Sequence, residues 1–125
     1  MACRNSKIPM GIEEIASSAF IFGYPGKIVE LPYGVCKIGE KAFEGCSDIT
    51  EVIIPASVTE IEPYAFRNCK NLQAVQILGP LKEITYGVFD DCIKLQSVNI
   101  PDACEFLSSS AFRGCSDELK KQIYK

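Results

Sequence analysis

The 125-residue sequence contains no histidine. Histidine is the commonest general base in enzymes and the usual partner of a catalytic serine or cysteine, so its absence removes those nucleophile pairs together. The nine glycines fall at turn positions between the regular segments and form no loop that could cradle a phosphate group. The sequence therefore predicts a protein that is not an enzyme and that binds no cofactor.

Grouped positive charge and long apolar segments are also missing. The net charge is -3 and the thirteen lysines and arginines are scattered, which argues against nucleic-acid binding because that requires clustered basic residues. No segment approaches the roughly 20 apolar residues that cross a bilayer, so we expect no membrane span. Residues 1–10 lack the apolar core of a signal peptide, and as written the chain is expected to remain intracellular.

What the sequence does contain is a repeat of 23 residues. Four of its seven cysteines recur at this spacing: Cys46, Cys69, Cys92 and Cys115. Constant spacing is typical of one repeated position and not of paired disulfide partners. We use the word column for the residues at one position of all repeats. We predict a single domain over residues 1–125, with about five repeats at 3–25, 26–48, 49–71, 72–94 and 95–117.

Two columns near the start of each repeat are almost entirely apolar. The fourth column is Val29, Val52, Val75 and Val98, and the sixth is Ile8, Leu31, Ile54, Ile77 and Ile100. Apolar residues at alternate positions, followed in most repeats by proline, predict one short strand per repeat. Because successive strands run in the same direction, we expect a parallel sheet.

The second half of each repeat returns the chain to the next strand. It ends in an Ala-Phe or Val-Phe pair whose phenylalanines are Phe20, Phe43, Phe66, Phe89 and Phe112. Alanine suits a tight helical turn and phenylalanine can close the core, so we predict helical or 3-10 turns on the return side. After the last repeat, Asp117 is suited to be an N-cap, and Leu119 and Ile123 are four residues apart. We predict a capping helix over residues 118–125.

The motif Leu-x-x-Val-x-Ile-Pro-x-x-Val-x-x-Ile-x-x-x-Ala-Phe-x-x-Cys resembles the BspA-like, or Treponema pallidum type, leucine-rich repeat over about residues 8–117. The resemblance implies an α/β repeat fold, a right-handed leucine-rich-repeat solenoid with its parallel sheet on the concave side. It also implies protein binding, since many members of the family are secreted or cell-surface proteins that adhere to host or matrix proteins. Those members usually have more repeats and a signal peptide, and this chain departs from them in both respects.

The cysteine column could hold zinc or form disulfides, but its predicted geometry opposes both. Stacked repeats place equivalent residues in a line, whereas zinc needs four ligands that converge on one point about 2.3 Å away. Parallel side chains also oppose the near-perpendicular dihedral of a disulfide. We therefore expect small buried packing residues in this column and no metal site. Outside it, we expect Cys104 to be buried, and Cys3 and Cys36 to be the sites open to oxidation.

Two pairs of adjacent carboxylates are the remaining candidates for chemistry. They are Asp90 with Asp91 and Glu13 with Glu14. Neighbours in sequence project in different directions, and neither pair is tied to a second candidate group, so we expect solvated surface charge at all four positions. No catalytic residue is assigned.

Strand residues that do not face the core define the predicted binding surface, because on a leucine-rich solenoid they point into the concave face. These candidates are Lys27, Ile28, Glu30, Thr50, Glu51, Ile53, Gln73, Gln76, Gln96 and Asn99. The four amides are suited to a peptide backbone or to sugar hydroxyls; the alternative is that they only keep an open sheet soluble. Ile28 and Ile53 are expected to lie side by side as an exposed apolar pair that a partner covers.

The sequence thus favours a module that binds a protein partner through its concave face. One alternative is a fragment of a longer cell-surface solenoid with an adhesive or structural role. Another is a small inhibitor that blocks the surface of a partner protein. Strand backbone at the ends of the solenoid could also pair with another copy, which leaves self-association open.

Overall fold

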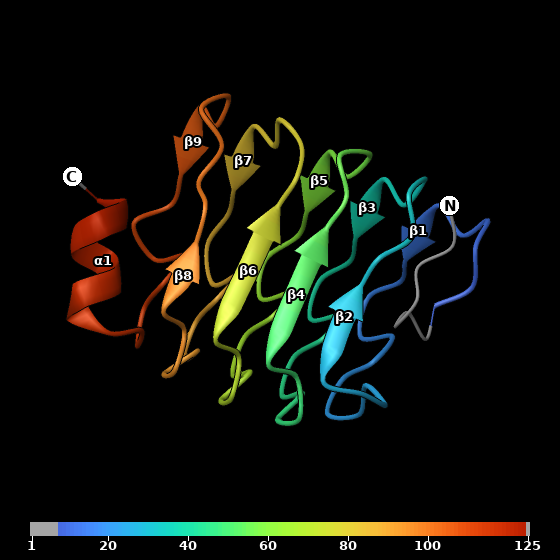
Figure 1. Cartoon of the computed structure of the whole chain (residues 1–125), viewed down its shortest axis with the longest axis horizontal. Coiled ribbons are helices and arrows are strands. Elements are labelled where there is room, and N and C mark those ends of the chain that lie inside the picture. Colours follow the sequence, from blue (N-terminus) through green and yellow to red (C-terminus); the bar gives the residue numbers. More distant parts are fainter. Residues whose placement is uncertain (1–7, 125) are drawn as a thin grey trace.

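The computed structural model describes residues 8–124, which form a solenoid of stacked repeats (Figure 1). One parallel sheet, here called the front sheet, has the strand order β2-β4-β6-β8. Its strands are β2 (Ile28–Glu30), β4 (Glu51–Ile54), β6 (Ala74–Ile77) and β8 (Ser97–Val98). Each strand pairs in register with the strand 23 residues later, as Val29 does with Val52. The prediction of a parallel-stranded solenoid is therefore confirmed.

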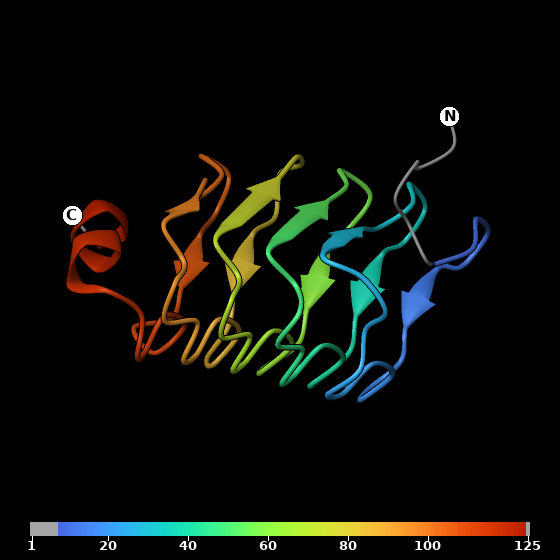
Figure 2. The same ribbon diagram turned by 60° about the horizontal axis from the view of Figure 1, so that its bottom comes forward.

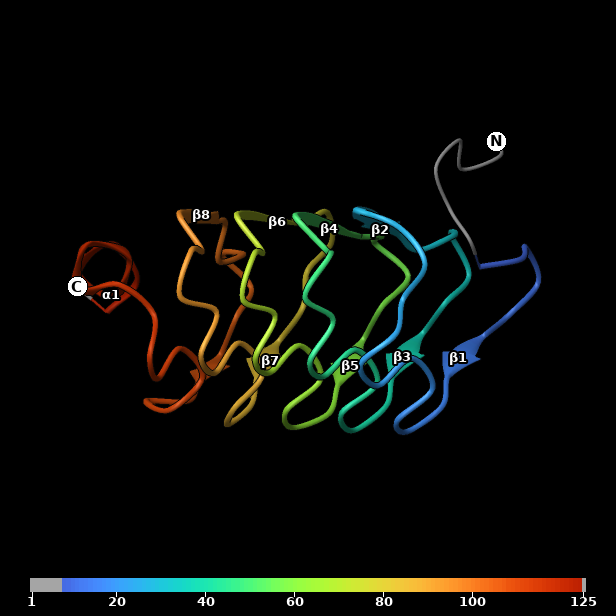
Figure 3. The same cartoon turned by 90° about the horizontal axis from the view of Figure 1, so that it is seen from below.

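Two-residue strands of the return side form a second layer behind the front sheet (Figure 3). They are β1 (Glu14–Ile15), β3 (Lys37–Ile38), β5 (Glu60–Ile61), β7 (Glu83–Ile84) and β9 (Phe106–Leu107). Strands β1, β3 and β5 pair in parallel, and β7 pairs with β9. The isoleucines of these strands, such as Ile38 and Ile61, are buried and close the core from behind.

The prediction of helical or 3-10 turns on the return side is wrong. In the part of the chain that the structure describes, the one helix is α1 (Asp117–Ile123), which follows the last repeat. The backbone amides of Ala42 and Glu44 donate to carbonyls three residues earlier, but those of Phe43 and Gly45 donate to carbonyls of the next repeat. Because every second amide bonds outside its own segment, a continuous helical ladder cannot form.

The phenylalanine column forms a stack that runs through the core. Neighbouring rings from Phe20 to Phe112 are nearly parallel, with centroids 5.1 to 5.7 Å apart and interplanar angles of 4° to 16°. At the N-terminal end Tyr24 lies edge-on to the rings of Phe20 and Phe43, and at the other end Tyr124 lies edge-on to Phe112. Tyr24 therefore packs beside the first two rings of the stack, and Tyr124 packs against the last ring.

Helix α1 lies at the C-terminal end of the solenoid (Figure 2). Its N-cap is Ser116, whose hydroxyl accepts a hydrogen bond from the amide of Leu119. Asp117, which we expected to be the N-cap, is instead the first helical residue. Leu119 is buried against the last repeat, and the hydroxyl of Tyr124 donates a hydrogen bond to the carbonyl of Ser108. These contacts fix the helix to the return half of that repeat.

The return layer is interrupted between β5 and β7, which belong to different sheets. Elsewhere a backbone hydrogen bond joins neighbouring repeats at this level, as from the amide of Glu62 to the carbonyl of Ile38. The carbonyl of Ile61 instead accepts a hydrogen bond from the side-chain hydroxyl of Thr85, at 3.2 Å. A side chain thus replaces the backbone bond at the interruption.

Two like charges meet where the interruption lies. In the twelfth column Lys37 pairs with Glu14 on one side and with Glu60 on the other, but the next residue of the column is Glu83. Like charges opposite one another on neighbouring strands are destabilising. The two strands stay apart and leave a cavity of about 110 Å³ that Glu60, Glu83 and Glu62 help to line.

Substituting lysine for Glu83 is expected to close this interruption, because the column would then alternate in sign from β1 to β7. We expect the free energy of unfolding to rise by about 0.2–1 kcal/mol in chemical denaturation. The amide of Thr85 should also exchange more slowly with deuterium. The control is Glu13→Lys, which makes the same change of charge at another exposed position of the return side. An equal rise in the free energy of unfolding for both substitutions would contradict a role of charge repulsion between Glu60 and Glu83.

Candidate functional site

The ten candidate residues all lie in or next to the strands of the front sheet. Along β4, the side chains of Glu51 and Ile53 point outward and are half-buried, while the residues that follow each of them are buried. The candidates of the second column, among them Lys27 and Thr50, directly precede a strand. The backbone still pairs at this level, since the amide of Thr50 donates to the carbonyl of Lys27 at 2.7 Å. The outward side of the front sheet, made by the ten candidates, is called the front face below.

Two of the four predicted amides are engaged in the fold. The side chain of Asn99 accepts a hydrogen bond from the amide of Ile77 and donates one to its carbonyl, both at 2.8 Å. These bonds extend the pairing of β6 beyond the two residues of β8. Gln76 donates from Nε2 to Oε2 of Glu51 at 3.0 Å. All four amides belong to exposed residues, so the predicted strip is exposed although two of its amides are already hydrogen-bonded.

Ile28 and Ile53 do not lie side by side as expected, because they occupy the third and the fifth column. The register pairs Ile28 with Glu51, and Glu30 with Ile53. Each isoleucine therefore has a glutamate opposite it on the neighbouring strand. The two isoleucines lie on one diagonal of this arrangement and the two glutamates on the other. All four residues are half-buried.

Two hollows adjoin the front sheet at its C-terminal end. One of about 410 Å³ is lined by Gln73, Ile93, Lys94, Leu95, Gln96, Ser116 and Glu118. The other, of about 530 Å³, is lined by Val98, Ile100, Gln122 and Ile123. Within residues 8–124, no three histidine, cysteine or acidic side chains are grouped so that they could hold a metal ion. No helix in that range is long and apolar enough to cross a membrane.

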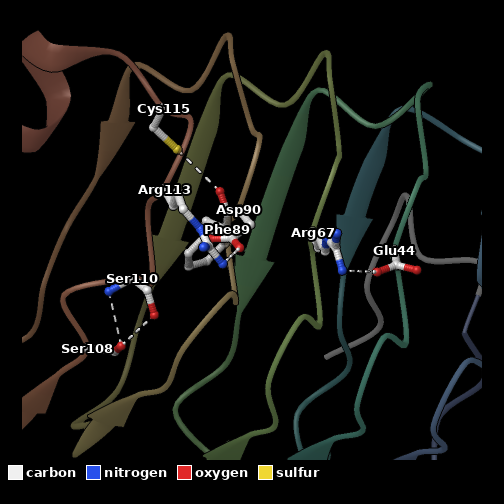
Figure 4. Close-up of polar contacts among 8 residues, drawn as sticks. All are labelled: Glu44, Arg67, Phe89, Asp90, Ser108, Ser110, Arg113 and Cys115. Atoms are coloured by element: carbon white, nitrogen blue, oxygen red, sulfur yellow. Dashed lines mark hydrogen bonds and ion pairs between the residues drawn. The ribbon is translucent and has the colours of Figure 1, made fainter.

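The nineteenth column carries charges whose arrangement the sequence analysis missed. It contains Glu44, Arg67, Asp90 and Arg113 in successive repeats (Figure 4). Arg67 Nη1 lies 3.8 Å from Glu44 Oε2, and Arg113 Nη2 lies 3.1 Å from Asp90 Oδ2. Asp90 is 3% exposed, so the expectation of a solvated pair is wrong for it, whereas Asp91 is exposed. Alternating sign at a spacing of 23 residues was the signal that could have revealed these ion pairs.

The four cysteines of the repeated column are buried and free. Each thiol donates a hydrogen bond to the carbonyl of the phenylalanine 26 residues earlier, at 3.0 to 3.2 Å, as Cys115 does to Phe89 in Figure 4. Burial raises the pKa of the thiols of Cys46, Cys92 and Cys115, the last to about 11. A thiol that stays protonated remains a donor, so this column links successive repeats.

The remaining cysteines lie outside this column. Cys104 is half-buried, not buried as expected, because within residues 8–124 its repeat is the last and the tenth column has no neighbour on that side. Cys36 is exposed and its thiol donates to the carbonyl of Gly34 at 3.3 Å. Cys3, for which we expected exposure, lies outside the described residues.

The buried thiols predict a loss of stability in alkaline solution. The pKa of Cys115 is raised by burial from its ordinary value of 9.0 to about 11, so the unfolded chain loses this proton first as the pH rises. The contribution of the protonated Cys115 thiol to the free energy of unfolding is complete below pH 9 and is lost as the pH rises to about 11. We expect urea unfolding midpoints to fall over this interval, and to fall less in Cys115→Val. The midpoint of Cys36→Val should fall with pH as that of the wild type does. An identical fall in all three proteins would contradict the assignment of this pH dependence to Cys115.

The hydrogen bonds of Asn99 predict that alanine substitution lowers the free energy of unfolding more at Asn99 than at Gln96. Asn99→Ala removes two hydrogen bonds to the backbone of Ile77 and should lower the free energy of unfolding by about 1–2 kcal/mol. Gln96→Ala, which removes an exposed amide, should change it by less than about 0.5 kcal/mol. Urea denaturation followed by circular dichroism measures both. A loss for Gln96→Ala as large as that for Asn99→Ala would contradict the structural role of Asn99.

The repeats match a known family model. This model describes the BspA-type leucine-rich repeat region, and six copies of it match residues 2–118. No curated protein has a significant similarity to the chain.

Several solved bacterial structures have the same fold. A leucine-rich cell surface protein from Faecalibacterium prausnitzii is 34% identical, with a TM-score of 0.70, over 74% of this chain and 25% of that protein. A leucine-rich repeat protein from Eubacterium ventriosum is 24% identical, with a TM-score of 0.66, over 87% of this chain and 36% of that protein. A leucine-rich repeat protein from Bacteroides ovatus is 18% identical, with a TM-score of 0.51, over 94% of this chain and 44% of that protein. The chain spans less than half the length of each.

Proposed function

Because the chain belongs to the BspA-type leucine-rich repeat family, we propose that it is a non-catalytic module that binds a protein partner through its front face. Repeat solenoids use the variable positions of an extended surface for recognition, while their constant columns hold the scaffold together. The front face has this character, since its second, third and fifth columns change chemistry from one repeat to the next.

One observation carries the proposal. The front face combines half-buried isoleucines, carboxylates that each lie opposite an isoleucine, and exposed amides, whereas the side chains of the constant columns hold neighbouring repeats together. The phenylalanines stack, the column thiols bond to carbonyls, and the charges of the nineteenth column pair with each other. The front face therefore carries outward side chains, such as Ile28 and Ile53, that the constant columns do not use.

A second candidate function is supported by one of the comparisons. The Faecalibacterium prausnitzii structure is that of a leucine-rich cell surface protein, and this chain corresponds to about a quarter of it. On this alternative, the repeats are one part of a longer surface solenoid with an adhesive or structural role. The front face would then be one segment of a larger binding surface.

Differential capture tests the proposal. Immobilised wild type is compared with a triple variant of the front face, Ile28→Glu, Ile53→Lys and Gln76→Ala, using lysate and culture medium of the source cells. We expect a protein that the wild type retains and the triple variant does not. A return-side triple variant, Phe106→Glu, Tyr86→Lys and Lys82→Ala, makes similar changes at exposed positions and should retain it. Loss from the return-side variant alone would place binding elsewhere and contradict the proposal.

A further inference from the structure

We infer that the part of the front face formed by β2 and β4 recognises lysine or arginine side chains, so that the partner presents a basic segment. This inference rests on the proposed function and names the chemistry of the partner. It is carried by four side chains in register: Ile28 opposite Glu51, and Ile53 opposite Glu30. The arrangement gives two equivalent apolar and acidic pairs that run in opposite directions across the two strands.

Within residues 8–124, the two front-face carboxylates have no basic partner. Four ion pairs join lysine or arginine to acidic residues within residues 8–124, and all of them lie on the return side or in α1. Neither Glu30 nor Glu51 belongs to one. Lys27, the basic residue at the margin of the front face, directly precedes β2 and forms no ion pair with either of them. A cationic partner would therefore supply the missing charge at this place.

One of the carboxylates is also held in position. Gln76 Nε2 donates to Glu51 Oε2 at 3.0 Å, and both residues are on neighbouring strands of the front sheet. The amide is neutral, so it orients the carboxylate without neutralising it, and the second carboxylate oxygen can still accept a hydrogen bond. A charged group that is held in place loses less entropy when a partner binds.

The isoleucines add a requirement for a long side chain. Lysine and arginine lay their aliphatic stems on apolar surface and extend the charged group beyond it. Opposite residues on neighbouring strands are about 4.8 Å apart, so a stem lying on Ile28 brings its charged end to Glu51. In the same way a stem on Ile53 leads to Glu30. A short cationic side chain would reach the carboxylates without covering the isoleucines.

The rest of the front face lacks this chemistry. At the third and fifth columns β6 and β8 contribute Ala74, Gln76 and Ser97, and Asn99 follows β8 with its side chain bonded to backbone. None of these residues is charged. Selection of a basic side chain is therefore confined to the half of the front face nearer the N-terminus.

Labelled peptides test the inference with the full chain. The probe is a fluorescein-labelled nine-residue peptide of alternating serine and lysine, compared with peptides in which norleucine, glutamate or diaminopropionate replaces lysine. Fluorescence anisotropy is measured at low and high salt. We expect the lysine peptide to bind about tenfold more tightly than the norleucine and diaminopropionate peptides, and less tightly as salt increases. The glutamate peptide should bind most weakly.

Two double variants separate charge from apolar contact. Glu30→Gln with Glu51→Gln should reduce the affinity for the lysine peptide to that for the norleucine peptide. Ile28→Thr with Ile53→Thr should remove the preference for lysine over diaminopropionate, measured at a pH low enough to keep both side chains protonated. The matched control, Glu13→Gln with Glu105→Gln, makes the same change of net charge at exposed return-side positions and should leave affinity unchanged. Thermal melts verify that each variant is folded.

Three results would overturn the inference: no preference for the lysine peptide over the norleucine peptide, no binding of the lysine peptide at all, or an equal loss in the return-side control. The proposed function can survive when the inference fails. If the norleucine peptide binds best and loses affinity in the isoleucine double variant, the front face is a binding surface for an apolar partner and only the basic chemistry is wrong.

Discussion

Each repeat of this protein is too short to bury its own apolar side chains, so its core exists only where equivalent residues of successive repeats lie on one another. The phenylalanine stack shows this dependence most directly, because each inner ring is covered on both faces by copies of itself. The backbone follows the same rule, since the amide of Phe43 donates to the carbonyl of Ala65 in the next repeat. The column thiols add a third link at the same level, from Cys69 to Phe43. Register, once set by these contacts, places every other side chain.

In-register stacking also brings charges of one column together, and the structure shows both outcomes. In the nineteenth column the sign alternates, and Asp90 can be buried because Arg113 of the next repeat pairs with it. In the twelfth column the alternation ends where Glu83 follows Glu60, and the return layer is interrupted there. Like charges on neighbouring strands repel, whereas opposite charges stabilise the pairing. The front sheet remains continuous across the same repeats, so the interruption is confined to the return side.

The front face differs from the rest of the solenoid in what its side chains are free to do. Residues of the constant columns are committed to neighbouring repeats, and even Asn99, at the margin of the front face, is committed to backbone. The other outward residues of the second, third and fifth columns escape this, so their chemistry can vary without disturbing the stack. Recognition is therefore proposed where the fold makes no demand on the side chains. The paired isoleucines and glutamates of β2 and β4 are the part of that surface with the most defined chemistry.

The sequence by itself determined the repeat length, the buried columns, the parallel strands and the family, because all of these depend on a pattern of burial that recurs along the chain. It also named the outward residues of the strands. Only the tertiary structure decided how the return side is built, because alternate amides there bond to the next repeat and no local propensity records this. The burial of Asp90 and the commitment of Asn99 to Ile77 were decided in the same way. Each depends on which residue of another repeat lies alongside, and a single row of sequence does not show that.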